Sequence, residues 1–515
     1  MYETIDCSRR VFDSAWSQHP ARQVEASSPP RDAGRASRHR IEHVDEDRKR
    51  QLRRRDRNRC VGHPGARIWT ALLRNFVDRS ADASIRRRSL AKKNSEYGKK
   101  NLATMTKIFP ISLKLKNEIF RVGQLAFDEK PKNHSSPALG FRYDADWLKN
   151  GFPLGSDLPL NNAVQFPKNE EGDFGEIETP PLFGFLRDHQ PGKWLENLSR
   201  TDENANQLTS FPFLLHQLSS CRNGKNRFSS LLIGESPVET AESPILTKRF
   251  ASELIHATES FFRDPARLTE KERDLLKKTG SDLGGRKMKF LVRSEKPPFK
   301  EYVLRVRNPI SKFDEPSWMY ICAELAKNAG IHVLSGTFMS GVGYLEERFD
   351  RRDEEELFCL SAKTLVRLSK NTVPCWLDVA DILNREGTSP KADLRELFLR
   401  LLFDTLTCNS RLTLDRIWFF RENGGWKLAP MSSPLSHPPL YPIRTLALPI
   451  AENIPYADPQ KALALARYFN LSGKEAKEML LEAMRAVGDW DRLAHSVCVN
   501  PREIALMKNA FHLSS

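Results

Sequence analysis

The stretch LRELFLRLLFDTLTCNSRLTLDRIWFFRENGGWKLAPMSSPL, residues 394–435, decides how this chain folds. Its first half predicts a helix, because apolar side chains recur every three or four residues, at Leu394, Leu397, Phe398, Leu401, Leu402 and Leu406. The helix should end near residues 408–410. Residues 417–420 and 426–428 predict two strands joined by a tight turn at Asn423-Gly424-Gly425, since Asn and Gly accept positive φ. The loop after the helix and the segment after the hairpin should face the same space.

Two groups of strands are expected upstream of this unit. Alternating apolar residues at 108–115, 119–127 and 139–148 predict a small antiparallel sheet. The segment GSDLGGRKMKFLV, residues 280–292, predicts a Gly-rich turn that leads into a strand. Glycine lets backbone N–H groups approach a phosphate closely, although a Gly-Gly pair alone is equally typical of a hairpin turn.

Further strands and several helices complete the expected order. Residues 302–307 and 342–349 predict strands, and residues 250–262, 318–331, 360–368, 377–381, 463–490 and 501–511 are expected to be helical. Within 463–490 the helix should break at Asn470-Leu471-Ser472-Gly473, where Ser472 can cap the second half.

Several of these segments resemble the HipA family, the Ser/Thr-kinase toxins of bacterial toxin–antitoxin pairs. Residues 122–127, VGQLAF, are similar to the family's V-G-x-L-x-F strand, and residues 280–289 to its G-x-S-L-G-G-x-x-x-K loop. Residues 347–351, ERFDR, resemble its hinge. Asn409 and residues 426–430, WKLAP, match the frame of its N-x-D-x-H-x-x-N catalytic loop and of its W-x-L-x-P-x-x-D segment.

The resemblance covers about residues 108–511 and implies an α+β, protein-kinase-like fold with two lobes. Residues 105–230 correspond to a HipA-like β-rich N-terminal subdomain and residues 231–350 to a kinase-like N-lobe with the Gly-rich loop and hinge. Residues 351–515 correspond to a mainly helical C-terminal lobe. A bacterial, cytoplasmic protein is implied.

The resemblance also implies where a nucleotide would bind. The corresponding cofactor-binding positions are Gly284, Gly285, Lys289, Arg305, Glu347 and Phe349. Arg305 stands where the family has its ATP-binding lysine, and its planar fork is not equivalent to a compact ammonium group. Asp282 stands at the position of the family's autophosphorylated, regulatory serine.

The chain departs from the family at the positions that carry the chemistry. The family's catalytic Asp falls on Arg411, and its two Mg-binding residues, Asn and Asp, fall on Arg416 and Ser433. We therefore expect weak ATP binding and do not expect a Mg site. Two arginines facing a phosphate pocket could instead bind an anion without Mg, although loss of selection would produce the same replacements. Asp415 could act as a displaced base, whereas an exposed or ion-paired Asp is the plainer interpretation.

Three functions are consistent with the sequence. The first is a pseudokinase that keeps the family's binding surface for an antitoxin-like helix-turn-helix protein or a sister HipA-like kinase, with DNA reached only through such a partner. The second is an active ATP-dependent Ser/Thr kinase toxin with a rearranged site. The third is a nucleic-acid-associated protein that acts through a basic N-terminal arm.

That arm holds most of the positive charge of the 515-residue chain. Residues 1–104 carry 25 Lys and Arg against 13 Asp and Glu, a net charge of +12 out of +15. The Arg-rich segment shows no helical or strand period and predicts disorder. It is interpreted as an extension upstream of a start at Met105, as a nucleic-acid-binding arm, or as a targeting peptide. The rest of the chain is nearly neutral.

Other classes of site find no support in the sequence. The eight cysteines form no C-x-x-C pair and no zinc-binding spacing, which is typical of proteins in a reducing compartment. No apolar run approaches the roughly 18 residues of a membrane span.

Overall fold

A computed structural model describes residues 107–116, 118–128, 138–167, 182–200, 228–234, 242–280, 283–285, 287–297, 299–352, 355–368, 372–438 and 444–511. The chain divides into two compact units, residues 1–102 and 103–515, and all described residues belong to the second. The predictions for residues 1–104 and for Asp282 therefore lie outside the described residues.

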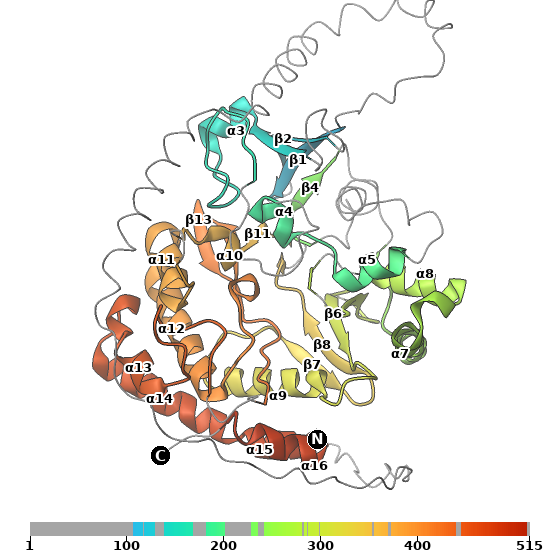
Figure 1. Ribbon diagram of the computed structural model, residues 1–515, viewed down its shortest axis with the longest axis vertical. Coiled ribbons are helices and arrows are strands. Elements are labelled where there is room, and N and C mark those ends of the chain that lie inside the picture. Colours follow the sequence, from blue (N-terminus) through green and yellow to red (C-terminus); the bar gives the residue numbers. More distant parts are fainter. Residues whose placement is uncertain are drawn as a thin grey trace, which may run out of the picture. The chain divides into compact units, whose positions relative to one another are not determined.

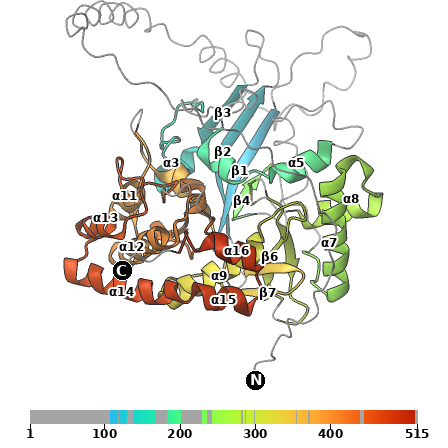
Figure 2. The same cartoon turned by 60° about the horizontal axis from the view of Figure 1, so that its bottom comes forward.

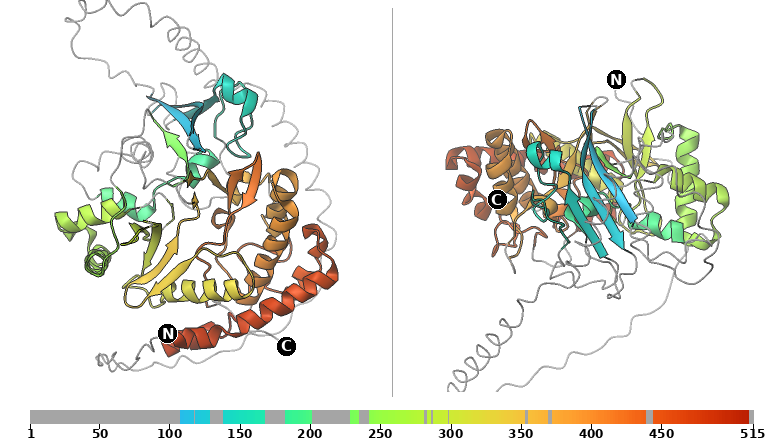
Figure 3. Two further views of the ribbon diagram at one scale, coloured as in Figure 1. Left: turned by 180° about the vertical axis from the view of Figure 1, so that it is seen from behind. Right: turned by 90° about the horizontal axis from the view of Figure 1, so that it is seen from above.

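The first sheet has the strand order β3-β2-β1-β4 and is antiparallel. Its strands are β1 (Lys107–Leu115), β2 (Glu118–Asp128), β3 (Ala138–Tyr143) and β4 (Leu231–Ile233). Alternate side chains such as Ile111 and Leu113 are fully buried, because successive residues of a strand point to opposite faces. The expected meander is confirmed, except that the strand predicted at 139–148 ends at Tyr143 and α3 (Ala145–Asn150) follows. Figure 3 shows this sheet edge-on, between the C-terminal helices and α7.

The second sheet, ordered β5-β6-β8-β7, carries the Gly-rich loop at one end. It consists of β5 (Phe290–Arg293), β6 (Glu301–Val306), β7 (Gly336–Met339) and β8 (Gly343–Glu347); the sequence predicts β5, β6 and β8 but not β7. Helices α5 (Lys193–Arg200), α7 (Lys248–Arg263) and α8 (Glu270–Thr279) form an apolar cluster with it, visible beside β6 in Figure 1.

Helix α8 was missed in the sequence, although its start carries a recognisable signal. The Thr269 hydroxyl accepts a hydrogen bond from the Glu272 backbone N–H, and the Glu272 carboxylate accepts one from the Thr269 N–H. This reciprocal pair is a capping box, which satisfies two N–H groups that a helix start leaves unpaired.

The prediction of a helix at residues 360–368 is wrong. Residues Cys359–Ser361 form strand β11, and only Ala362–Leu365 are helical, as α10. The reason is tertiary, because β11 pairs with β12 (Trp418–Glu422), which pairs with β13 (Gly425–Leu428). A further short hairpin, β9 (Arg351–Arg352) with β10 (Glu355–Glu356), precedes β11.

The central helix of the C-terminal lobe is α12 (Pro390–Thr407), the helix expected from the opening stretch. It is buried on nearly all sides in its second half and ends at Cys408, whose φ of 49° is left-handed. Around it pack α11 (Trp376–Glu386), α13 (Pro459–Leu463), the 3-10 turn η4 (Ala466–Phe469) and α14 (Gly473–Gly488). Together with α9 (Glu315–Asn328) these helices pack into one apolar core that also includes buried side chains of the first sheet, such as Ile111 and Phe141.

The C-terminal helices cover α9, as Figure 2 shows. Ser472 caps α14 through a capping box with Glu475, which confirms the predicted break. Helices α15 (Trp490–Ser496) and α16 (Pro501–Met507) follow. The buried Glu503 carboxylate accepts a hydrogen bond from the Trp318 indole N–H at 3.1 Å and so ties α16 to α9.

A buried carboxylate joins the β-rich part to β11. Asp188, at the end of α4 (Gly184–Asp188), accepts hydrogen bonds from the backbone N–H and the hydroxyl of Ser361, both at 2.7 Å. Burial raises the pKa of Asp188 to about 6 in spite of these bonds. The Asp188 carboxyl therefore binds its proton more tightly in the folded state than in the unfolded state, in which an Asp has a pKa of about 3.9.

We expect the free energy of unfolding to fall by about 2 to 3 kcal/mol through Asp188 as pH rises from about 4 to about 6, and to level off above that. Urea unfolding across this range should show that slope in the wild type and a shallower one in Asp188→Asn. The exposed residue Asp381 provides the control, because Asp381→Asn should keep the wild-type slope. If the free energy of unfolding depends on pH in the same way in the wild type and in Asp188→Asn, Asp188 is not the group responsible for the slope.

The described part of the chain is thus an α+β fold, with antiparallel sheets in its first half and mainly helices in its second. Among the described residues, no helix is both long enough and apolar enough to span a membrane.

Candidate functional site

The described part of the Gly-rich loop between α8 and β5 is hydrogen-bonded to its own lysine. Gly284 and Gly285 have φ values of +60° and +80°, a region that side chains with a Cβ rarely adopt. In this conformation the Lys289 Nζ donates hydrogen bonds to the carbonyl oxygens of Leu283, at 2.9 Å, and Gly284, at 3.1 Å. The lysine that the resemblance assigns to a nucleotide is thus engaged by the loop.

The closed loop rests on the hinge. Leu283 packs with Phe349 and Trp418 in a small apolar cluster, and the rings of Phe349 and Trp418 are 5.5 Å apart. Beneath the loop lies a cavity of about 60 Å³, called the Gly-loop cavity here, whose lining includes Lys289, Arg305, Glu346 and Phe349. Pockets for drug-sized ligands measure about 300–1,000 Å³, so a nucleotide needs this loop to open.

A buried glutamate, Glu346 on β8, occupies the centre of the site. Its carboxylate accepts hydrogen bonds from the Ser433 backbone N–H and from the Ser433 hydroxyl, each at 2.6 Å. The Arg305 guanidinium approaches it only to 4.0 Å. Burial raises the pKa of Glu346, and the charge of Arg305 and the bonds from Ser433 oppose that rise. Ser433 has a φ of +45°, so its backbone is held in the left-handed region at this contact.

Arg305 has a poor set of partners for a charged group. Its side chain is 16% exposed, and its Nε is buried without a hydrogen-bond partner. Burial lowers the pKa of Arg305; Glu346 opposes this effect and Arg416 adds to it. An ionised side chain that is removed from water needs hydrogen bonds or a counter-charge, and Glu346 supplies only part of that need.

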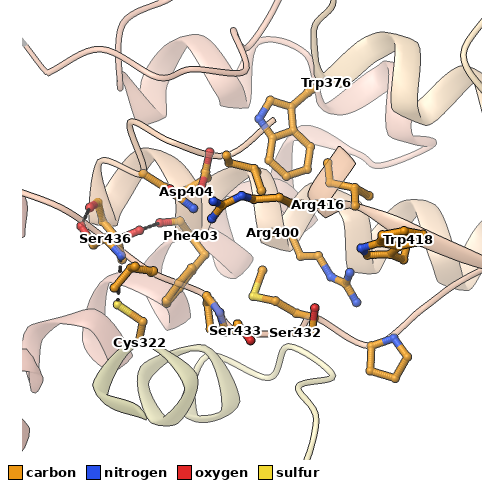
Figure 4. Close-up of a pocket in the computed structure, with 18 residues that line it drawn as sticks. Cys322, Trp376, Arg400, Phe403, Asp404, Arg416, Trp418, Ser432, Ser433 and Ser436 are labelled. Carbon is orange, nitrogen blue, oxygen red and sulfur yellow. Dashed lines mark hydrogen bonds between the residues drawn. The ribbon is translucent and has the colours of Figure 1, made fainter. Parts of the chain in front are cut away.

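The loop after α12 is held by hydrogen bonds at its first residues, whereas its arginine side chains are exposed to solvent. The Asn409 backbone N–H donates to the Asp404 carbonyl at 3.2 Å, and the Arg411 N–H faces the Asn409 side-chain oxygen at 3.4 Å. Residues Leu414–Arg416 form the 3-10 turn η3. Arg411 and Arg416 are both exposed. Figure 4 shows Arg416 and Ser433 in the lining of one pocket of about 40 Å³, close to the buried Asp404.

The arginines of this loop act electrostatically on the lysines of the Gly-rich loop. Burial lowers the pKa of Lys289 well below its ordinary value, and the charges of Arg305 and Arg416 lower it further. Burial also lowers the pKa of Lys287, with smaller contributions from Arg416 and Arg411 that oppose its pairing with Glu315.

One ion pair in this region joins the Gly-rich loop to α9. The Lys287 Nζ lies 2.6 Å from the Glu315 carboxylate, which also lies 3.8 Å from the buried His437 ring. Burial alone would raise the pKa of Glu315, but His437 and Lys287 outweigh burial and bring it to about 2. Glu315 is therefore fully ionised at neutral pH and stabilises Lys287 in its charged form.

The hinge is built on a second buried network. The Asp350 carboxylate is fully buried and accepts from the Arg348 guanidinium at 2.7 Å and 2.9 Å, and from Arg351 at 2.8 Å. The Ser229 backbone N–H donates to the same carboxylate at 2.7 Å, which links the hinge to the start of β4. Glu347 pairs instead with Lys300 at 2.8 Å, on the exposed side.

The structure divides the predicted site residues between two pockets. Lys289, Arg305, Glu347 and Phe349 line the Gly-loop cavity, beside Gly284 and Gly285 of the loop, whereas Arg416 and Ser433 line the other pocket. Glu347 also pairs with Lys300, and Arg411 is exposed and lines neither pocket. Sequence reasoning missed Glu346, Glu315 and Lys287. One signal in the sequence points to Glu346. Glu346 and Glu347 are adjacent on a strand, so their side chains lie on opposite faces of the sheet and one of the two carboxylates must be buried.

The donor set at the two Mg-ligand positions does not fit Mg²⁺, which prefers carboxylate and water oxygens. Arg416 is a cation, and both the hydroxyl and the N–H of Ser433 donate to Glu346. Across the part of the chain that the structure describes, no three His, Cys, Asp or Glu side chains are placed to hold a metal ion.

Comparisons with known proteins agree with this architecture. A family model described as the HipA-like C-terminal domain matches residues 281–490. Among solved structures, HipA in a complex of the Shewanella oneidensis MR-1 toxin–antitoxin system with HipB and operator DNA matches at a TM-score of 0.50 and 15% identity. That match covers 78% of this chain and 95% of the other.

A second solved structure, the Helicobacter pylori proinflammatory kinase CtkA, matches at a TM-score of 0.33 and 12% identity, over 43% of this chain and 88% of the other. This similarity is too low to support an assignment. No curated protein matches the sequence. The family model places a HipA-like C-terminal domain at residues 281–490, and the chain shares the α+β kinase-like fold of the Shewanella HipA.

Proposed function

We propose that this protein is a pseudokinase of the HipA family, which keeps the kinase-like scaffold and has lost phosphotransfer. The contact between Ser433 and Glu346 carries the proposal. In a kinase the residue at the Ser433 position presents a carboxylate to a metal ion, whereas Ser433 presents two hydrogen-bond donors to a buried carboxylate at 2.6 Å. The position that carries a negatively charged metal ligand in a kinase therefore carries hydrogen-bond donors in this protein.

The loop supports the same conclusion. A kinase uses an Asp of its catalytic loop to accept the proton of the substrate hydroxyl, and metal ions to neutralise the phosphates. Arg411 stands at that Asp position and is always protonated, so it cannot accept a proton. A kinase accelerates phosphotransfer mainly by positioning the reacting groups and by neutralising the charge of the phosphates. In this protein the residues at the base position and at the metal-ligand positions are different.

An active kinase with a rearranged site is the second candidate, and Asp415 is the observation in its favour. Asp415 is exposed on η3, and its charge opposes the lowering of the pKa of Lys289. The charge of Asp415 therefore acts on Lys289. Among the described residues, no group of three or more His, Cys, Asp or Glu side chains is placed to hold a metal ion there, so we rank this candidate below the pseudokinase.

The proposed setting is a bacterial, cytoplasmic toxin–antitoxin type system. The Shewanella HipA structure is a complex with HipB and operator DNA. By analogy, the proposed partner is an antitoxin-like helix-turn-helix protein or a sister HipA-like kinase, with DNA reached only through that partner. Co-purification of this chain with the product of a neighbouring helix-turn-helix gene would test the partnership.

Weak ATP binding that does not require Mg is proposed for the cleft. The Gly-rich loop is present, but Lys289 is bonded to the loop and the Gly-loop cavity is small, so opening reduces the affinity. Calorimetry should give a dissociation constant for ATP that changes less than about threefold between EDTA and Mg²⁺. A strict requirement for Mg²⁺ would mean that another carboxylate, such as Asp415, binds the metal.

A further inference from the structure

The Gly-rich loop is attached to α9 at a carboxylate oxygen that also faces a histidine. The Lys287 Nζ lies 2.6 Å from Oε1 of Glu315, and the His437 Nε2 lies 3.8 Å from the same oxygen. Glu315 is the first residue of α9, whereas His437 belongs to the segment that follows Ser433. Two nitrogen atoms from distant parts of the chain therefore approach one oxygen, the first within ion-pair contact and the second just beyond hydrogen-bond distance.

The His437 ring is enclosed without hydrogen bonds. Its side chain is 6% exposed, and in the part of the chain that the structure describes neither ring nitrogen has a hydrogen-bond partner. The ring stacks on that of Phe313 at a centroid distance of 5.3 Å. A neutral imidazole has one N–H donor and one acceptor nitrogen, and no hydrogen bond fixes either of them here. The charged groups around the ring therefore decide whether it takes up a second proton.

Charged groups on α9, in the Gly-rich loop and in the loop after α12 act on His437. Burial lowers the pKa of His437 below its ordinary value, Glu315 opposes this effect, and the charges of Arg411 and Lys287 add to it. His437 is therefore mainly neutral at pH 7, where Glu315 is ionised.

The interaction between Lys287 and His437 must work in both directions. The charge of Lys287 disfavours a second proton on His437, so by linkage a protonated His437 disfavours Lys287 at its place beside Glu315. A protonated imidazole is in addition a donor at both nitrogens, and it competes with Lys287 for the same Glu315 oxygen. Lower pH should thus weaken the contact between the Gly-rich loop and α9.

We propose that Lys287 and Glu315 form a pH-sensitive latch, which fastens the Gly-rich loop to α9 while His437 is neutral and releases it when His437 is protonated. The latch acts beside the contacts of Lys289 with the loop carbonyls and of Leu283 with the hinge, which contain no group that titrates near neutral pH. This inference goes beyond the proposed function and does not rest on it, because the latch concerns access to the cleft and not phosphotransfer.

The experiment is hydrogen–deuterium exchange of the full-length protein, read from peptides that span residues 283–289. After correction for the intrinsic effect of pH, the wild type should exchange about threefold faster at about pH 5 than at about pH 7.5, the size expected for a half-exposed ion pair. His437→Gln should remove this difference, and Lys287→Gln should exchange fast at both pH values. His256→Gln is the matched control, because His256 lies 3.7 Å from Glu272 but is 74% exposed on α7. It should keep the pH dependence of the wild type.

The pKa of His437 gives a second measurement by NMR of the histidine-labelled protein, with the signal identified through its contact with the Phe313 ring. Linkage requires the same factor in both experiments, so Lys287→Gln should raise this pKa by about half a unit. The Lys287 side chain is 39% exposed, so its variant should fold normally even if His437→Gln does not. The latch would be overturned by loop exchange in the wild type that ignores pH, by a pH dependence that persists in His437→Gln, or by a pKa that Lys287→Gln leaves unchanged.

Discussion

Replacing Asp350 by Asn should lower the free energy of unfolding by about 3 to 5 kcal/mol, a large fraction of the stability of a typical domain. Asp350 is fully buried and holds Arg348, whose side chain is 1% exposed, through two hydrogen bonds. Removing one partner of a buried pair leaves the other charge without compensation, and that charge cannot reach water. Glu301, 3.2 Å from Arg348, offsets only part of the loss.

Chemical denaturation at pH 7 measures this effect. Asp381→Asn is the matched control, because Asp381 pairs with Arg385 on the surface of α11 and is 56% exposed. Exposed pairs contribute about 0 to 1 kcal/mol, so the control should unfold close to the wild type. If Asp350→Asn unfolds at the same denaturant concentration as the control, the hinge network does not hold the fold together.

Rebuilding the family's residues should make the protein depend on Mg²⁺. The variant combines Arg411→Asp, Arg416→Asn, Ser433→Asp and Arg305→Lys. Its new carboxylate at position 433 would face Glu346, which now lies 2.6 Å from the Ser433 hydroxyl. Two carboxylates at that distance repel each other unless a cation lies between them. Mg²⁺ should therefore raise the melting temperature of the variant and leave that of the wild type unchanged.

The same variant should transfer phosphate at about 10²-fold or more above the background of the assay, the range that general-base catalysis alone contributes. The control is the pair Arg411→Asp and Arg305→Lys, which leaves both Mg-ligand positions unfilled and should show neither activity nor a Mg²⁺-dependent melting temperature. If Mg²⁺ does not change the melting temperature of the fourfold variant, positions 416 and 433 do not face a common metal site.

Much of the fold could be predicted from the sequence because its signals are local. The apolar stripe of α12, the turn at Asn423-Gly424 and the Ser472 cap each act over a few residues, and each is confirmed. The failure at residues 360–368 has a different cause. The pairing of Cys359–Ser361 with Trp418–Phe420 joins segments that are far apart in the chain, and such pairing overrides local helix propensity.

In the candidate site, too, only the local signals could be used for prediction. Sequence motifs identify positions such as Lys289 and Ser433, but they do not identify the groups to which these residues are hydrogen-bonded. Glu346 binds Ser433 across 87 residues of sequence, and no local pattern predicts which of two adjacent glutamates turns inward. The closure of the Gly-rich loop by its own lysine likewise depends on the backbone conformation at Gly284 and Gly285.

The central claim is that the wild-type chain does not transfer phosphate. The direct measurement incubates the full-length protein with ATP labelled at the γ-phosphate and Mg²⁺, and follows both autophosphorylation and transfer to a generic protein substrate. An intact HipA kinase run in parallel shows that the assay works. We predict no transfer above background, for the wild type and for Asp415→Ala alike. Metal-dependent phosphorylation by the wild type that Asp415→Ala abolishes would contradict the pseudokinase and make Asp415 the catalytic base.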